Sequence, residues 1–148
     1  MNNKQSGMTL IVKTVTRLTV GLIFLFGVYL VLNGHLSPGG GFAGGVVIAL
    51  SFVHIMLAYG KDMAFKRITG NFASTVESLG ALLFISIALL GLSGGYFFLN
   101  VLGHGKPFQL FSAGTIPLSN IAIALKVSAG LSAIFIALVI FDIGSKDK

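Results

Sequence analysis

A single lysine, Lys126, lies inside the last of four long apolar stretches of the sequence. A cation at the centre of a membrane-spanning helix costs roughly 2.5 to 3.5 kcal/mol on insertion scales, so it needs a partner or water. The sequence has no Asp or Glu between Glu77 and Asp142, and we therefore expect no acid of this chain at the depth of Lys126. Lys126 is then either a proton carrier that changes its charge or a fixed cation completed by another protein.

Three other ionisable residues lie towards one common membrane boundary, each on a different apolar stretch: Arg17, His54 and Glu77. An imidazole titrates near neutrality, so a cluster of these three side chains, with His54 among them, is suited to the entry of protons. The alternative is structural, with Arg17 paired to Glu77 and His54 hydrogen-bonded to backbone. Glu77 and Lys126 approach the membrane from opposite sides, so we expect that they do not pair directly.

The composition indicates the elements that must position these residues. Charged residues make up 9% of the 148, hydrophobic residues 55%, and the mean hydropathy is +0.96, which excludes a small soluble domain. The net charge of +6 comes from residues that flank the apolar stretches, so it indicates topology and not nucleic-acid binding. We find no phosphate loop, HExxH motif, metal-ligand cluster or cysteine, and we predict neither an enzyme nor a cofactor.

Four stretches are long enough to cross a hydrocarbon core of about 30 Å. They predict an all-α integral membrane protein, a single domain over residues 1–148, with transmembrane helices near residues 14–33, 40–59, 74–95 and 119–141. The first two helices should form a tight hairpin across Gly34 to Gly39. Residues 107–117 are apolar but too short to span, and we assign no helix to them.

Positive charge sets the predicted orientation. It collects at the amino terminus, in the second connection with Lys61, Lys66 and Arg67, and at the carboxyl terminus. By the positive-inside rule, both termini are predicted to be cytoplasmic.

Small residues line one or more faces of three predicted helices, and such faces let helix backbones approach closely in lipid. The second helix carries two neighbouring faces, one with Gly40 and Gly44 and one with Gly41 and Gly45, so we expect it to have two close neighbours. Lys126 lies on the small-residue face of the fourth helix, which places it against protein or a cavity. The number of small faces favours an interface with other subunits; the alternative is that one compact bundle uses them all.

The run Asn33 to Gly45, NGHLSPGGGFAGG, is the most specific motif of the chain, and it resembles the signature of the MnhB subunit of the multisubunit Mrp (also called Mnh) cation/proton antiporters. A second block, GTIPLSNIAIALKV from Gly114 to Val127, is also similar to this MnhB-like family. The resemblance covers about residues 13 to 141. Ser37 and Pro38 are typical of a helix start, and the glycines suit close packing. The residues of the family motif and of the adjoining packing surface are Gly34, His35, Ser37, Pro38, Gly39, Gly40, Gly41, Phe42, Gly44 and Gly45.

The resemblance implies an accessory subunit of a secondary antiporter in the bacterial plasma membrane, which exchanges cytoplasmic Na⁺ for external H⁺ and serves pH homeostasis. The implied partners are the other Mrp antiporter subunits (A, C, D, E, F and G). An alternative is a membrane-arm subunit of an ion-translocating respiratory complex such as a membrane-bound hydrogenase. Within either assembly the chain lines the ion path through Lys126, Glu77, His54 and Arg17, or it acts only as a scaffold.

Overall fold

The computed structural model describes residues 8–60, 70–103, 105 and 112–146, and within these residues it consists of four long helices without strands. Each is long and apolar enough to cross a membrane, α5 over Ile116–Phe141. The predicted all-α class is therefore confirmed. The helices are α1 (Leu10–Leu32), α2 (Gly40–Tyr59), α4 (Gly70–Leu92) and α5 (Ile116–Lys146).

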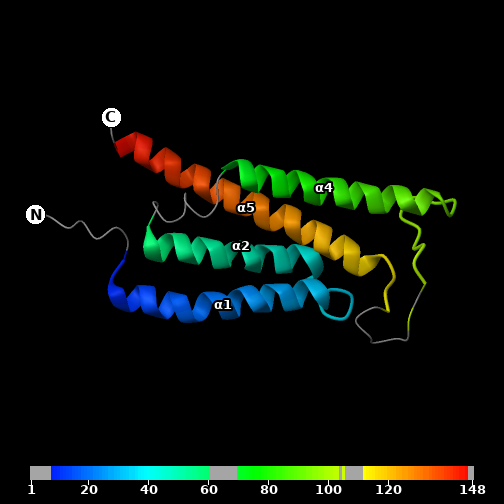
Figure 1. The fold of residues 1–148 in the computed structure, drawn as a ribbon, viewed down its shortest axis with the longest axis horizontal. Coiled ribbons are helices and arrows are strands. Elements are labelled where there is room, and N and C mark those ends of the chain that lie inside the picture. The colour runs from blue at the N-terminus through cyan, green and yellow to red at the C-terminus, as the bar shows by residue number, and fades with distance from the viewer. Residues whose placement is uncertain (1–7, 61–69, 104, 106–111, 147–148) are drawn as a thin grey trace, which may run out of the picture.

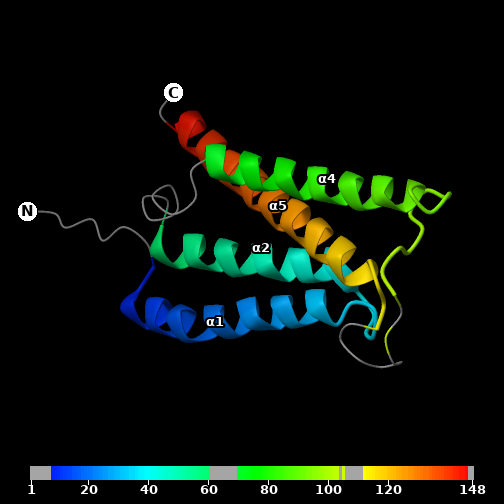
Figure 2. The ribbon, with the colours of Figure 1, turned by 45° about the vertical axis from the view of Figure 1, so that its right-hand side comes forward.

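The helices form two pairs that join along α2 and α5 (Figure 1). α1 packs on α2, while α5 packs on both α2 and α4 and touches α1 only slightly. α1 and α4 lie at opposite edges of the bundle in both views, and α5 crosses obliquely between α2 and α4 (Figure 2). The first residues of α1 and the last residues of α5 lie at the same end of the bundle, as four successive crossings require.

Small side chains form most of the contacts between helices. The most deeply buried apolar residues are alanines, whereas many leucines and phenylalanines are exposed on the outside of the bundle. Helices in lipid gain little by burying leucine against leucine, and they associate where small residues bring the backbones together. The bundle therefore turns its large apolar side chains towards the surroundings. The buried alanines are Ala49, Ala58, Ala73, Ala88, Ala122, Ala124 and Ala129.

Two glycine faces of α2 contact two different helices, which confirms the prediction that this helix has two close neighbours. A Cβ atom placed on Gly44 would lie 2.9 Å from the carbonyl oxygen of Gly27 in α1. A Cβ atom placed on Gly45 would lie 3.0 Å from the carbonyl oxygen of Ala124 in α5. Real Cβ atoms rarely approach this closely, so both interfaces depend on glycine.

The connection from α1 to α2 is the tight hairpin turn that the sequence predicts. The backbone N–H groups of Leu36 and Ser37 both donate to the carbonyl oxygen of Asn33, at 2.8 and 2.9 Å. The hydroxyl of Ser37 donates to the same carbonyl, at 3.0 Å. Gly39 follows with a φ of 120° and precedes the first residue of α2. The prediction that Ser37 and Pro38 begin the helix is wrong, because Ser37 bonds back into the turn and the chain needs a glycine at position 39 before it can become helical.

The predicted helices 14–33 and 40–59 agree closely with α1 and α2, but α4 and α5 begin earlier than the predicted residues 74 and 119. Pro117 is the second residue of α5, where its missing N–H is tolerated because no carbonyl of the helix needs it. Of the apolar segment 107–117, residues 112–115 form turns before α5 and residues 107–111 lie outside the described residues. Lys61, Lys66 and Arg67 also lie outside them, and the cytoplasmic placement of the termini stays a prediction.

Candidate functional site: an ion pair and a glycine junction

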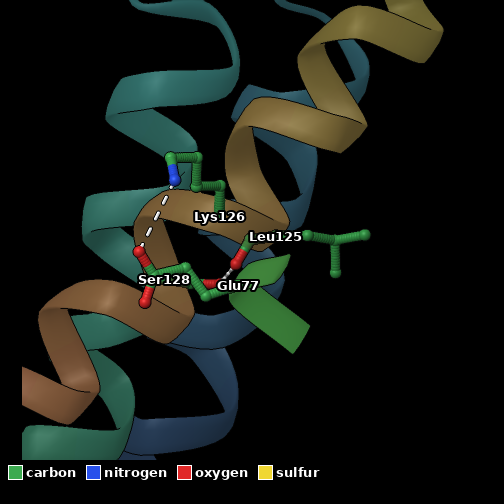
Figure 3. A network of polar contacts seen from close by, with 4 residues as sticks. All are labelled: Glu77, Leu125, Lys126 and Ser128. Carbon is green, nitrogen blue, oxygen red and sulfur yellow. Dashed lines mark hydrogen bonds and ion pairs between the residues drawn. The ribbon is translucent and has the colours of Figure 1, made fainter. Parts of the chain in front are cut away.

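Lys126 of α5 pairs with Glu77 of α4. The lysine Nζ lies 3.5 Å from Oε1 of the carboxylate (Figure 3). Within this chain, 53% of the Lys126 side chain and 41% of the Glu77 side chain are exposed. The ion pair therefore lies on the surface of the bundle, inside two helices that are apolar enough to span a membrane.

The prediction that no acid of this chain reaches Lys126, and that Glu77 cannot pair with it, is wrong. Because α4 begins at Gly70 and α5 at Ile116, both residues lie deeper in their helices than expected, at about 10 Å and 15 Å from the respective helix starts. In a hydrocarbon core of about 30 Å, these two depths leave only a small separation between Glu77 and Lys126 across the membrane. The long side chain of Lys126 spans this separation, so the lysine pairs with an acid of its own chain.

Glycines lie on both α4 and α5 beside the ion pair, and one of them, Gly80, lets the two helices approach closely. A Cβ atom placed on Gly80 would lie 2.8 Å from the backbone nitrogen of Lys126 and 2.9 Å from the carbonyl oxygen of Ala122. A Cβ atom placed on Gly130 would lie 3.7 Å from the carboxyl carbon of Glu77, which is ordinary contact. Gly80 is thus the residue that fixes the helix separation at the depth of the pair.

The structure does not bring Arg17, His54 and Glu77 together. Arg17 is exposed on α1, and α1 lies at the edge of the bundle opposite α4 (Figure 1). His54 is partly buried on α2 and makes no hydrogen bond or ion pair within the part of the chain that the structure describes. The structural alternative, an Arg17–Glu77 pair with a backbone-bonded His54, is therefore wrong, because Glu77 is engaged by Lys126 on the neighbouring helix.

The motif residues form the hairpin turn and the first turns of α2. Gly34 and His35 are partly buried in the turn, while Pro38, Gly39 and Phe42 are exposed. Gly41 is buried against α5, and a Cβ atom there would overlap the backbone of Asn120. A Cβ atom on Gly34 would lie 2.5 Å from Nδ2 of the same asparagine. The two sequence blocks that carry the family resemblance thus meet at one junction.

Asn120 is a site residue that the sequence reasoning missed. Its Oδ1 accepts a hydrogen bond of 3.3 Å from the backbone N–H of Gly41. Gly41 is the second residue of α2, whose N-cap is a glycine without a side-chain cap, so its N–H has no acceptor inside the helix. Asn120 therefore caps α2 from across the α2–α5 interface. The available signal was an amide side chain inside an otherwise apolar block, which needs a polar partner.

No group of three or more His, Cys, Asp or Glu in the described residues is placed to hold a metal ion. The polar side chains of the site form one ion pair and supply two partly buried imidazoles, His35 and His54, and one capping amide. These groups can hold charge and fix helix positions at membrane depth.

Four helices that are long and apolar enough to cross a membrane, with an ion pair on the surface of their bundle, define a multi-pass membrane protein. Residues 11–133 match the family described as a domain related to the MnhB subunit of Na⁺/H⁺ antiporter. The chain belongs to this MnhB family.

Two relatives and one solved structure extend this result. An uncharacterized protein of Methanocaldococcus jannaschii is 37% identical over 118 residues, which are 75% of this chain and 45% of the relative. The B subunit of the Na⁺/H⁺ antiporter of Bacillus subtilis is 34% identical over 110 residues, which are 68% of this chain and 76% of the relative.

The structure of the membrane-bound sulfane sulfur reductase, an archaeal respiratory membrane complex, contains a chain with a TM-score of 0.78 and 31% identity. The match covers 94% of this chain and 63% of that chain. This chain therefore spans less than half of the archaeal relative and less than two thirds of the similar chain in the solved structure.

Proposed function

We propose that this chain is an accessory membrane subunit of a hetero-oligomeric antiporter that exchanges cytoplasmic Na⁺ for external H⁺ in the bacterial plasma membrane. The similarity to the B subunit of a Na⁺/H⁺ antiporter supports the class of assembly. The proposed partners are the other Mrp antiporter subunits (A, C, D, E, F and G), and both termini are proposed to face the cytoplasm. The chain contributes no enzymatic step in this proposal.

The observation that carries the proposal is the half-exposed ion pair of Lys126 and Glu77. Charged groups inside a membrane are costly when they face lipid, and they typically face protein or a water-filled path. Since the exposed part of this pair is not covered by the described residues of the chain, another subunit or water must cover it. A subunit of an ion-transporting assembly meets this requirement.

We infer that Lys126 and Glu77 are the principal candidates for an ion or proton path in this chain. They are adjacent, charged and accessible from one side of the bundle. His54 and Arg17 do not join the pair, and they stay candidates only for the entry of protons from the cytoplasmic side.

The test is Na⁺-dependent proton exchange in membrane vesicles that contain the complete complex, with Lys126→Ala and Glu77→Gln compared with wild type. Loss of most of the exchange at an unchanged amount of assembled complex is expected. Ser86→Ala is the matched control, because Ser86 is partly exposed on α4 and its hydroxyl bonds only within its own helix, to the carbonyl of Leu82. Full exchange in both charge variants would remove the pair from the ion path.

A second candidate function is a membrane-arm subunit of an ion-translocating respiratory complex. The specific support is the match over most of this chain to part of an archaeal respiratory membrane complex. The same exposed ion pair fits such an arm equally well, because ion-translocating arms also contain charges at membrane depth.

Purification of the native complex distinguishes the two candidates. Co-purification with other antiporter subunits supports the antiporter. Redox subunits with iron–sulfur clusters beside this chain would replace the first proposal by the second. Exchange of ions by the isolated chain in liposomes would contradict both, since each describes an incomplete component.

A further inference from the structure

A groove with a volume of 1090 Å³ opens on the bundle and is lined by residues of all four helices. Neither Lys126 nor Glu77 lines it, so the groove is separate from the ion pair. α1 and α4 lie at opposite edges of the bundle (Figures 1 and 2). Residues of both helices line the groove. A groove of this size inside a membrane is filled by lipid or by protein.

The depth of the lining residues follows from contacts between helices. The hydroxyl of Tyr59, the last residue of α2, donates to the carbonyl oxygen of Lys13 at 3.3 Å, so these two residues lie at one level. Thr16 and Arg17 lie about one helical turn further along α1, roughly 4 to 6 Å deeper. The polar tips of Thr16, Arg17 and Tyr59 therefore gather at the same end of the groove.

The groove becomes apolar along α1 away from this end. α1 presents Val20, Phe24 and Val28 along one stripe, and Phe52 of α2 meets Phe24 edge to face with ring centroids 6.2 Å apart. This stripe begins one turn beyond Arg17 and continues towards the hairpin. The groove thus has a cationic end near the membrane boundary and an apolar body, which is the layout of a phospholipid.

Arg17 supplies the positive charge at the cationic end of the groove. It is exposed, and it forms no ion pair within the described part of the chain, where Glu77 is engaged by Lys126. Arg17 lies about 10 Å from the start of α1, and a long arginine side chain at this depth extends its head back towards the interface. A guanidinium binds phosphate through two parallel hydrogen bonds, and phosphates are present at this level throughout a bilayer.

We propose that this groove binds an anionic phospholipid, whose phosphate pairs with Arg17 and whose acyl chains lie along Val20, Phe24 and Val28. A partner helix would satisfy Arg17 only if it carried an acid at this one depth, whereas a lipid brings its phosphate there by its own position in the bilayer. Lipid binding by Arg17 is an alternative to proton entry through this residue. Because lipid binding is measured without transport, the lipid proposal and the proposed function can fail separately.

The test counts lipids bound to the full-length chain by native mass spectrometry, with phosphatidylglycerol and phosphatidylcholine as probes. Arg17→Gln is expected to weaken phosphatidylglycerol binding by about tenfold. The matched control is Lys13→Gln, which removes the same charge one turn away on the same helix, outside the groove. A clearly smaller loss is expected for this control, and equal losses in the two variants would show general charge attraction and overturn the proposal.

A second variant tests the apolar body without a change of charge. Val28→Trp fills the groove and is expected to displace the bound lipid, whereas Leu22→Trp, on an exposed position of the same helix, is expected to leave it in place. Thermal unfolding in detergent verifies that both variants fold. Unchanged binding in Val28→Trp contradicts the proposal, as does a structure of the assembled complex in which a helix of another subunit occupies the groove.

Discussion

Lys126 and Glu77 stabilise each other in a region where a single charge is expensive, and both remain half exposed within the chain. Such a pair is adaptable, because its free side can bond to water or to a polar group of another subunit. Asn120 has the opposite character, since its Nδ2 is buried and its Oδ1 is committed to α2. At the scale of residues, the ion pair is exposed on the outside of the bundle, whereas Asn120 joins two of its helices.

The two charges are expected to depend on each other. Glu77→Gln leaves the lysine uncompensated, so the double variant Glu77→Gln with Lys126→Met should be more stable than Glu77→Gln alone. We expect a coupling of about 1 kcal/mol, at the lower end for contacting residues because the pair is half exposed. Thermal unfolding in detergent of the wild type, of the single variants Glu77→Gln and Lys126→Met, and of the double variant measures this coupling. Strictly additive effects would show that the pair contributes nothing to folding.

Asn120→Ala is expected to destabilise the chain by about 1 kcal/mol, because the N–H of Gly41 loses the acceptor that caps it. Ser119→Ala is the control, since the hydroxyl of Ser119 donates to Thr115 near the start of its own helix. Urea or thermal unfolding in detergent compares the two variants. If they unfold alike, the capping role of Asn120 is wrong.

At the scale of elements, α2 and α5 form the centre of the bundle, and glycines determine how closely their neighbours approach. The sequence predicted this part well: helix number, the hairpin and the two glycine faces of α2 follow from apolar length and small-residue spacing. The ion pair was not predicted because it depends on where α4 and α5 begin. A shift of a few residues at each helix start moves a charge by several ångströms, and hydropathy alone does not locate such starts.

Gly80→Ala is expected to separate α4 from α5 and to lengthen the ion pair. Its new Cβ atom would meet the backbone of Lys126 at 2.8 Å, and backbone cannot move aside as a side chain does. We expect a loss of about 1 to 3 kcal/mol, as for overpacked interiors. Gly130→Ala, whose Cβ atom meets Glu77 at an ordinary 3.7 Å, should be tolerated. Unfolding in detergent compares the two, and equal stability would contradict the close approach at Gly80.

Gly41→Leu and Gly44→Leu are expected to reduce the amount of assembled complex, because the added side chains exclude α5 and α1 respectively. Gly21→Leu provides the control, since a Cβ atom at Gly21 meets nothing within 4 Å. Blue-native electrophoresis of solubilised membranes measures assembly. Normal complex from the Gly41 and Gly44 variants would show that these contacts are dispensable.

At the scale of the whole molecule, the four helices place the start of α1 and the end of α5 on one side of the bundle and the hairpin turn on the other (Figure 1). The ion pair and the groove open on this bundle at separate sets of residues. The chain therefore offers two distinct surfaces in the membrane, a charged one and an apolar one with a cationic end. Because the two surfaces are separate, the proposed lipid in the groove would leave the ion pair free for a protein neighbour.

The orientation is tested with the native sequence as background, because it contains no cysteine. Leu36→Cys in the exposed hairpin turn and Lys146→Cys at the end of α5 introduce single thiols at opposite ends of the bundle. A membrane-impermeant maleimide added to intact cells should label position 36 and leave position 146 unlabelled until the cells are opened. The reverse pattern would place both termini outside.

The pairing of Glu77 with Lys126 has a consequence for biosynthesis. The ribosome delivers α4 with its carboxylate before the lysine of α5 has been made, so the translocon receives an acidic helix whose counter-charge is still to come. On the charge argument, α4 is best retained in the insertion channel until α5 arrives and cancels its charge.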